Sequence, residues 1–505
     1  MIRPENKNIA ITVGMLLFSF IICFLNFKTS PLYLINEWCD PNIYFSIGKG
    51  MFNGKVVYKD LFDHKGPLIF IIYGIGYLIS NTSFTGVYLI QSLFLFTSLL
   101  FAYKLSKLYL NDIQSFIITL IYTCLFFSKT GTGGSADEFM LPFFTVSFYY
   151  FILYFKKENN LKQATVNKIM LIQGLTFGAV FFIKFSAAIF WIPILAAIYY
   201  TLFASKKYKE ALSAILYTTL GFSILAAPLL LYFLINSAFG DFVFAYFKFN
   251  AIYANTGFTI NTLKTIAGRF IGVGREFYIA WALTLGGLAV ILFSNRFVQK
   301  KVYKAAILIS FIITYLPIAN SRFHHLYAYI VLYVLAIIAL IYLFQLINSY
   351  IKSPVKIKPA ILYITVPVIT IVSITHYHTV LYNNKDCLSF SYCRDKCWML
   401  QKDFAEVIKT RENPTLLDLG LDRGIFTTSG VVPTFKYFFH PLISDEDFPE
   451  ILEYQTELVK NKEPMFIVTT DKNFPYLMEN YDIAAIDTFH YLGNDLHTYL
   501  FERKE

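Results

Sequence analysis

Long runs of apolar residues recur along most of the chain and alternate with short polar segments. Many of these runs approach the roughly 20 residues that an α-helix needs to cross a bilayer. The predicted spans are 9–27, 84–103, 113–128, 139–155, 169–184, 186–204, 211–236, 277–295, 304–320, 326–347 and 359–377. No small-residue cleavage site follows the first run, so we expect an uncleaved helix. The pattern predicts an all-α polytopic membrane protein with about eleven transmembrane helices.

The segment 67–80 is short and is predicted to be broken by Gly74 and Gly76, which is typical of an interfacial or re-entrant helix. If it does not cross, the connections between spans fall into two alternating groups. One group is almost purely basic: Arg3 and Lys7; Lys104 and Lys107; Lys156, Lys157, Lys162 and Lys168; Lys206, Lys207 and Lys209; Arg296, Lys300, Lys301 and Lys304; Lys352, Lys356 and Lys358. The other group holds the acidic loops 28–66, 129–138, 237–276 and 321–325. Basic loops stay in the cytoplasm, so the N-terminus is predicted inside and the acidic loops outside.

The tail changes character after about residue 378 and becomes polar. Apolar runs of strand length lie at 414–419 and 465–470, and amphipathic helices fit 399–410 and 448–461. We therefore predict a transmembrane domain over 1–377 and a small extracytoplasmic α/β domain over 378–505.

Composition agrees with a membrane protein, because 56% of the residues are hydrophobic and only 15% are charged. The net charge of +10 comes largely from the basic cytoplasmic loops, which also favour anionic lipid headgroups. Since these basic residues are spread over many short loops, nucleic acid is not an expected partner.

The six cysteines leave a disulfide open. Cys387, Cys393 and Cys397 cluster in the tail, and Cys39 lies in the first outer loop. An oxidising exterior permits a disulfide among them, with no pairing assigned. A zinc site would need more Cys or His at regular spacing, so the pattern assigns no metal ligands.

Ionisable residues concentrate in the outer loops, above all in 36–67, NEWCDPNIYFSIGKGMFNGKVVYKDLFDHKGP. The candidates are Asp40, Asp60, Asp63, His64 and Lys65; Asp137 and Glu138; Asp241, Lys248, Arg269, Arg275 and Glu276; and Arg322, His324 and His325. Such residues at a membrane edge are functional candidates. Carboxylates can abstract a proton or hold a metal, and cations can hold a phosphate whose charge grows as it leaves.

Each group also has a purely structural explanation. Asp40 precedes Pro41 and is placed to cap a helix over 41–52. In the same way Asp137 and Glu138 would cap the span at 139, and Asp60 and Asp63 would be solvated loop acids. Lys65 would anchor the chain at the membrane interface. His324 and His325 would make ordinary hydrogen bonds. Together these structural roles do not explain why the acids and both histidines fall on one face.

The run from Asp40 to Leu68, D-P-N-I-Y-F-x-I-G-K-G-M-x-N-G-K-V-V-Y-K-D-L-F-D-H-K-G-P-L, resembles the first-loop signature of a family of bacterial enzymes. These are the GT-C glycosyltransferases of the dolichyl-phosphate-mannose mannosyltransferase-like superfamily, including the RgtA/B/C/D-like and aminoarabinose-transferase-like enzymes. Further matches follow in order: Ala136-Asp137-Glu138, GLTFGAVFFIK at 174–184, R-x-H-H-x-Y at 322–327, FTTSG at 426–430 and PMFIV at 464–468. The resemblance covers nearly the whole chain.

The family uses a sugar carried on a polyprenyl phosphate, and the resemblance implies a role for each matching residue. Asp40 would deprotonate the acceptor hydroxyl, and Lys65 would contact the carrier phosphate. Asp137 or Glu138 would orient acceptor or donor. Arg322 and His325 would contact phosphate, with Arg275 as a further candidate. Many relatives carry a second acid where this chain has Pro41, so a divalent metal stays an open cofactor with no ligands assigned.

The resemblance implies an inverting glycosyltransferase, moving a hexosyl or pentosyl group in the bacterial inner membrane for glycan biosynthesis of the cell envelope. Its partners would be a polyprenyl-phosphate-linked sugar, membrane lipid, and a lipid, glycan or protein acceptor. A glycan ligase using a polyprenyl-diphosphate donor would favour a long, very basic outer loop, and loop 237–276 is only moderately basic. A lipid-linked sugar transporter or flippase would favour internal repeats and polar residues at mid-span. The chain shows neither, but a ligase and a transporter both stay open.

Overall fold

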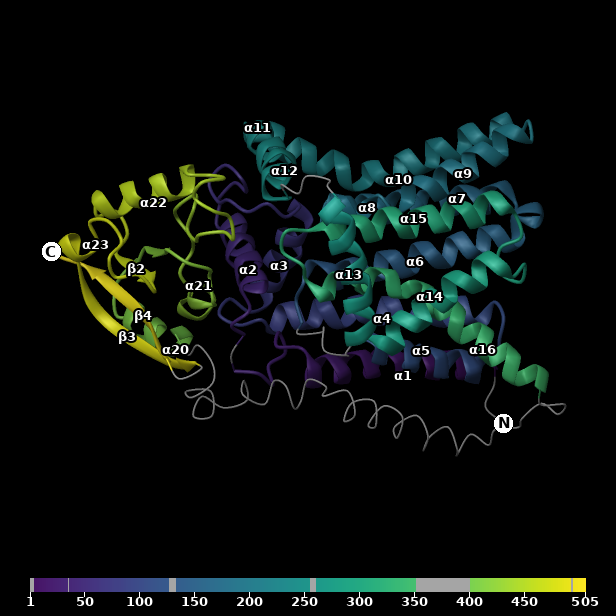
Figure 1. The fold of residues 1–505 in the computed structure, drawn as a ribbon, viewed down its shortest axis with the longest axis horizontal. Coiled ribbons are helices and arrows are strands. Elements are labelled where there is room, and N and C mark those ends of the chain that lie inside the picture. Colours follow the sequence, from purple (N-terminus) through teal and green to yellow (C-terminus); the bar gives the residue numbers. More distant parts are fainter. Residues whose placement is uncertain (1–3, 35, 127–132, 255–259, 351–399, 492–493) are drawn as a thin grey trace.

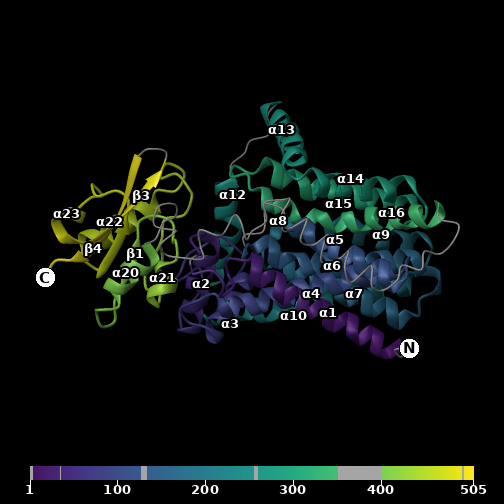
Figure 2. The same ribbon diagram turned by 90° about the horizontal axis from the view of Figure 1, so that it is seen from below.

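The computed structural model describes residues 4–34, 36–126, 133–254, 260–350, 400–491 and 494–505. Its helices run side by side along the long axis of the molecule, and the C-terminal α/β domain covers one end of them (Figures 1 and 2). The predicted architecture of a helical membrane domain with a small α/β domain is confirmed.

The helices of the membrane domain lie where the apolar runs predict them. They are α1 (Pro4–Asn26), α4 (Thr85–Lys107), α5 (Asp112–Phe126), α6 (Ala136–Lys157), α7 (Gln163–Phe181), α8 (Phe185–Ala188), α9 (Trp191–Ala204), α10 (Tyr208–Ile235), α14 (Tyr278–Phe293), α15 (Lys301–Asn320), the 3₁₀ helix η3 (Leu326–Leu335) and α16 (Ala336–Tyr350). The structure therefore places helix in every predicted span except 359–377, which lies outside the described residues.

Fewer of these helices than predicted are long enough to cross a membrane. Within the described ranges, eight helices are long and apolar enough, or nine if a bent pair counts as one span. The bent pair is α13 (Ile260–Glu276) and α14, and the chain bends by 115° between these two helices. The predicted spans 113–128 and 277–295 correspond to α5 and α14, and each of these helices is shorter than a full span by itself.

Short helices build the end of the membrane domain that faces the C-terminal domain. They are α2 (Cys39–Phe52), α3 (Pro67–Ile79), α11 (Phe239–Val243), the π-helical turn η2 (Phe244–Lys248) and α12 (Phe249–Ala254); the 3₁₀ turn η1 (Glu158–Asn160) follows α6. Helix α3 is too short to cross a bilayer, as the sequence predicted for 67–80. Its glycines do not break it but let other helices approach. A Cβ on Gly48 of α2 would lie 2.5 Å from the Gly74 nitrogen, so α2 packs directly on the α3 backbone.

The C-terminal domain is built on a four-stranded sheet. Its strands are β1 (Leu416–Asp418), β2 (Phe466–Thr469), β3 (Tyr481–Tyr491) and β4 (Asn494–Arg503), in the order β1-β2-β4-β3. Strands β1 and β2 are parallel, and the other two pairs are antiparallel. The surrounding helices are α20 (Leu400–Ile408), α21 (Ile425–Ser429), α22 (Glu450–Lys460) and α23 (Leu477–Asn480). The two predicted strands correspond to β1 and β2, and the hairpin of β3 and β4 was not anticipated.

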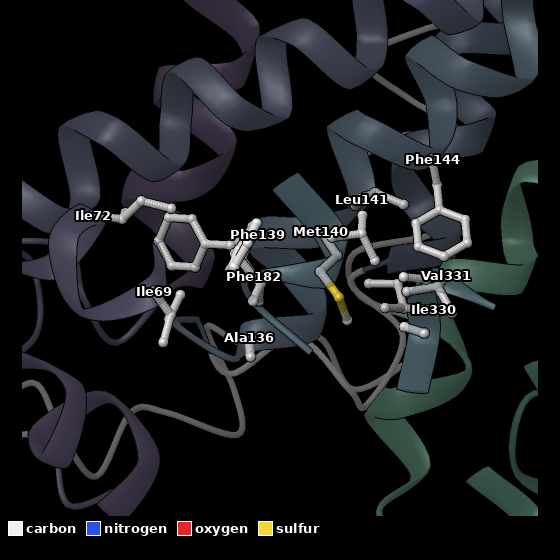
Figure 3. Packing of buried hydrophobic residues seen from close by; sticks show 14 of the residues in the cluster. Ile69, Ile72, Ala136, Phe139, Met140, Leu141, Phe144, Phe182, Ile330 and Val331 are labelled. Atoms are coloured by element: carbon white, nitrogen blue, oxygen red, sulfur yellow. The ribbon is translucent and has the colours of Figure 1, made fainter. Parts of the chain in front are cut away.

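An apolar core supports the segments that carry polar residues. Figure 3 shows Ile69 of α3, Phe139 and Met140 of α6, Phe182 after α7 and Val331 of η3 gathered around the first turns of α6. All five are buried. Because close-packed interiors resist displacement, this core fixes the helix starts from which the site is built.

Candidate functional site

A cavity of about 440 Å³ lies between the membrane helices and the C-terminal domain. Its volume falls in the range of small-molecule sites, roughly 300–1,000 Å³. The acids, lysines and histidines that line it are Asp40, Asp63, His64, Lys65, Asp137, Lys184 and His325. These residues come from three of the four predicted outer loops and from the turn after α7, so segments far apart in sequence converge on one space.

Asp40 lies in the first turn of α2 and does not cap it. The N-cap residue is Trp38, which makes no side-chain capping bond. The Asp40 carboxylate instead accepts a hydrogen bond from the Tyr327 hydroxyl at 3.3 Å. Its place near a helix N-terminus stabilises a negative charge, and its side chain faces the cavity. A carboxylate at this place in the cavity wall can reach a hydroxyl group bound in the cavity.

Asp63, His64 and Lys65 form a linked polar row. The Asp63 Oδ1 lies 3.1 Å from His64 Nδ1 and accepts the His64 backbone N–H at 2.7 Å. On the other side, His64 Nε2 lies 3.0 Å from Lys65 Nζ. The ammonium can only donate, so His64 is the acceptor there and is neutral. The row thus holds a lysine ammonium at the cavity wall.

Burial and charge explain the ionisation of this row. Burial and the Lys65 charge lower the pKa of His64. Burial opposes ionisation of Asp63, but the polar contacts of His64, including its backbone N–H, together with the Lys65 charge outweigh burial and lower the pKa of Asp63. Burial alone would lower the pKa of Lys65, and the carboxylates of Asp40 and Asp63 more than offset this and raise it. Lys65 is therefore a permanent cation.

These shifts predict a pH dependence of stability. A histidine with a lowered folded-state pKa contributes stability that is complete above the unfolded value of about 6.5 and is lost as pH falls through it. We expect the melting temperature of the purified protein to fall from pH 7.5 to 5, because the free energy of unfolding decreases by up to about 1.4 kcal/mol per pH unit for one proton. His64→Gln, which cannot ionise, should remove this part of the slope.

The matched control is His497→Gln, which changes an exposed histidine on β4. Its pH slope should equal that of the parent protein. An unchanged slope in His64→Gln would show that His64 does not resist protonation in the folded state.

Asp137 and Glu138 are neighbours with different surroundings. Asp137 is 3% exposed, lines the cavity and pairs with Lys184, whose Nζ lies 3.1 and 3.3 Å from its two carboxylate oxygens. Glu138 does not line the cavity. Its Oε2 accepts hydrogen bonds from the Gln91 side chain at 2.6 Å and from the Gly134 N–H at 2.7 Å. The N-cap of α6 is Ser135, so neither acid caps this helix.

His325 lines the cavity directly before η3, stacked on Tyr327 with ring centroids 5.1 Å apart. Burial lowers the pKa of His325. His324 points to another partner, because its Nε2 lies 2.9 Å from the Tyr329 hydroxyl. The two adjacent histidines therefore have different roles, since His325 lines the cavity and His324 is paired with Tyr329.

The structure does not bring the remaining candidates into the cavity. Arg322 is bound to Asp447 of the C-terminal domain at 2.5 Å. Arg275 is exposed in the last turn of α13. Asp60 accepts the Val56 N–H at 2.7 Å and closes a turn. Of the four residues predicted to contact phosphate, Lys65 and His325 line the cavity and the two arginines do not.

Several cavity residues were not among the sequence candidates. Lys184 ends the glycine-rich run 174–184, and Tyr327 ends the R-x-H-H-x-Y turn, so both had a signal in the motifs. Tyr253 and Asn250 of α12 also line the cavity, as does a wall from the C-terminal domain. No local pattern marks these residues.

Metal ligation finds no support among the residues that the structure describes, since no three His, Cys, Asp or Glu side chains there are grouped to hold an ion. Cys39 lines the cavity. The tail cysteines Cys387, Cys393 and Cys397 lie outside the described residues, so the disulfide that the sequence leaves open is not tested.

Comparisons with known proteins agree with this architecture. Residues 64–233 match the family model of dolichyl-phosphate-mannose-protein mannosyltransferase. The fold is similar to that of ArnT from Cupriavidus metallidurans, solved in the apo state and bound to undecaprenyl phosphate, with a TM-score of 0.65, 12% identity and 98% of each chain covered. It is also similar to the archaeal oligosaccharyltransferase AglB from Archaeoglobus fulgidus in complex with an inhibitory peptide and a dolichol-phosphate. There the TM-score is 0.53 at 12% identity, with 93% of this chain and 70% of that chain covered. No curated protein sequence matches the chain. The predicted GT-C fold is confirmed.

Proposed function

We propose that this chain, a membrane glycosyltransferase of the GT-C fold, moves one sugar from a polyprenyl-phosphate-linked donor to an acceptor on the outer face of the membrane. The observation that carries the proposal is the convergence of Asp40, Lys65 and Asp137 on one cavity beside the membrane helices. A carrier for lipid-linked sugars would instead need a polar path through the bilayer.

The proposed reaction is a direct displacement at the anomeric carbon. Asp40 takes the proton of the acceptor hydroxyl as its oxygen forms the new glycosidic bond. The bond between the anomeric carbon and the phosphate oxygen breaks, and polyprenyl phosphate leaves with that electron pair. Attack opposite the leaving group inverts the anomeric configuration. A base of this kind contributes about 10²–10⁴ in rate.

Lys65 and His325 are assigned to the donor phosphate. The leaving phosphate gains charge, and fixed donors in a site sheltered from water stabilise that charge most. Lys65 is already an ammonium in the free protein because Asp40 and Asp63 favour its charged form. Asp137 and Lys184 hold each other in place and are assigned to orienting the sugar and its acceptor.

The test of the proposal is transfer by the purified protein in lipid nanodiscs. Polyprenyl-monophosphate and polyprenyl-diphosphate sugars are offered separately with a membrane lipid extract as acceptor, and the products are read by mass spectrometry. We expect transfer from the monophosphate donor only. Transfer from the diphosphate alone would identify a ligase. Movement of intact donor across the bilayer without a new glycosidic bond would identify a transporter.

The orientation in the membrane gives a separate prediction. Asn160 follows α6 and Lys472 follows β2, and both are exposed. In a variant whose native cysteines are replaced by serine, Lys472→Cys should react with an impermeant maleimide from outside in intact cells, and Asn160→Cys only after permeabilisation. The basic loops require this arrangement. Labelling of position 160 in intact cells would invert the topology and move the cavity to the cytoplasmic face.

A further inference from the structure

The C-terminal domain is attached to α2 through a buried polar row. Asn42, Ser46 and Lys49 lie about one helical turn apart on one face of α2, and each is 0% exposed. Thr427 of α21 donates to Asn42 Oδ1 at 3.0 Å, and Ser46 donates to Asp422 Oδ2 at 2.9 Å. Buried polar groups are costly unless they are paired, so this face of α2 suits contact with the C-terminal domain.

Lys49 adds a buried amine to the row. Its Nζ donates to the Phe426 carbonyl at 2.7 Å and to the Val431 carbonyl at 3.4 Å. The rings of Phe45 and Tyr77 lie 5.6 and 6.0 Å from the same nitrogen. Both carbonyls belong to the C-terminal domain. Burying a lysine without such partners would strongly destabilise the folded protein. The two hydrogen bonds therefore favour one specific placement of α2 relative to α21.

The row leads to Asp40 through Asn42. The Asn42 amide donates to the carbonyls of Asn36 and Trp38 at 2.7 and 2.9 Å, which fixes the approach to α2. The Trp38 ring packs edge-on against Tyr327 at 5.3 Å, and Tyr327 donates to Asp40. The hydrogen bond from Thr427 to Asn42 therefore helps to fix the start of α2, and the start of α2 sets the position of the Asp40 carboxylate.

The same domain closes one side of the cavity. Leu421, Phe439, Pro441 and Leu442 of this domain line the cavity and form an apolar part of its wall. Leu421 directly precedes Asp422, which joins this wall to the buried row. An apolar wall excludes water and strengthens the electrostatic interactions inside the cavity.

We propose that the C-terminal domain is a working part of the catalytic cavity, and that the row of Asn42, Ser46 and Lys49 with Asp422 and Thr427 positions Asp40 for proton abstraction. This inference rests on the proposed transferase function and extends it. The five residues of the row do not line the cavity. They are positioning residues, which act on the reaction through α2.

The experiment removes one hydrogen bond from the C-terminal side. Thr427→Val keeps the shape of the side chain and removes the hydroxyl that donates to Asn42. We expect kcat to fall roughly 10-fold or more, because a small misplacement of a reacting group costs rate steeply, while KM for the donor changes little. Thr427→Ser retains the hydroxyl and should restore most of kcat. Lys49→Met, if it folds, should act in the same direction.

Thr498→Val is the matched control. Thr498 is buried in β4, and its hydroxyl has no hydrogen-bond partner among the described residues. The substitution should leave kcat and KM unchanged. If Thr427→Val matches this control while Asp40→Asn is inactive, the positioning role is refuted and the transferase function stands. If the unaltered protein itself transfers no sugar, the proposed function fails first.

A lower melting temperature of Thr427→Val with normal kcat per folded molecule would also refute the inference. That outcome would mean that the row only holds two domains together. A loss of kcat with Thr427→Val, and its recovery with Thr427→Ser, is what positioning requires.

Discussion

Asp40→Asn should abolish sugar transfer while the protein still folds and inserts into the membrane. Asparagine cannot take the proton of the acceptor hydroxyl, and loss of a general base costs about 10²–10⁴ in rate. The structural cost is small, because a charge at a helix N-terminus is worth roughly 0.3–1 kcal/mol. The measurement is turnover with a polyprenyl-phosphate sugar, compared per folded molecule after gel filtration and thermal melting.

Asp60→Asn is the matched control for this result. Asp60 belongs to the same loop, does not line the cavity and accepts a backbone N–H at 2.7 Å. The control should keep near-normal turnover with a slightly lower melting temperature. Normal turnover of Asp40→Asn would leave Asp40 only a structural role at the start of α2.

Lys65→Ala should lose most of its donor use, by about 10²–10³ in kcat for one missing donor to developing charge. Lys65→Arg should restore part of this loss, because arginine keeps the charge but presents it in a different geometry. The pKa of the neighbouring His64 should also change. Without the Lys65 charge, a cause that lowers the pKa of His64 is removed. The measurement is kcat and KM over a range of donor concentrations.

Two other cations serve as controls for Lys65. Lys59 is exposed and donates to the Asn236 carbonyl at 3.0 Å, so Lys59→Ala should be nearly silent. Arg322→Ala breaks a partly exposed ion pair with Asp447, and water screens such pairs so that they contribute little to stability. Its effect on donor use should be small. A loss as large as that of Lys65→Ala would show that Arg322 contacts the phosphate in the loaded enzyme.

The order of the helices could be predicted from the sequence because it depends on local properties. The length of an apolar run decides whether a helix crosses a bilayer, and the run is readable residue by residue. The strands β1 and β2 are short apolar runs of the same local kind. The bend of 115° between α13 and α14 was not readable, because packing against neighbouring helices decides it. Gly74 was interpreted as a break in α3, whereas it is a site of close helix packing.

The candidate site divides in the same way. Residue type and motif singled out Asp40, Lys65 and Asp137, since ionisable side chains beside apolar runs are rare and conspicuous. Sequence could not separate Asp137 from Glu138, although successive helical positions face about 100° apart. Only the tertiary structure directs Asp137 to Lys184 and the cavity, and Glu138 to Gln91 and Gly134.

What only the tertiary structure decided is which groups meet. Arg322 resembled a phosphate ligand in the sequence, but a carboxylate of the C-terminal domain binds it. Leu421 and Leu442 carry no chemical signature, yet they form a wall of the cavity. The sequence by itself determined the membrane helices and singled out the acid and lysine of the first loop as candidates, because these depend on short-range patterns. The partners of those residues depend on contacts between segments hundreds of positions apart, such as Ser46 with Asp422, and no local pattern encodes such a distance.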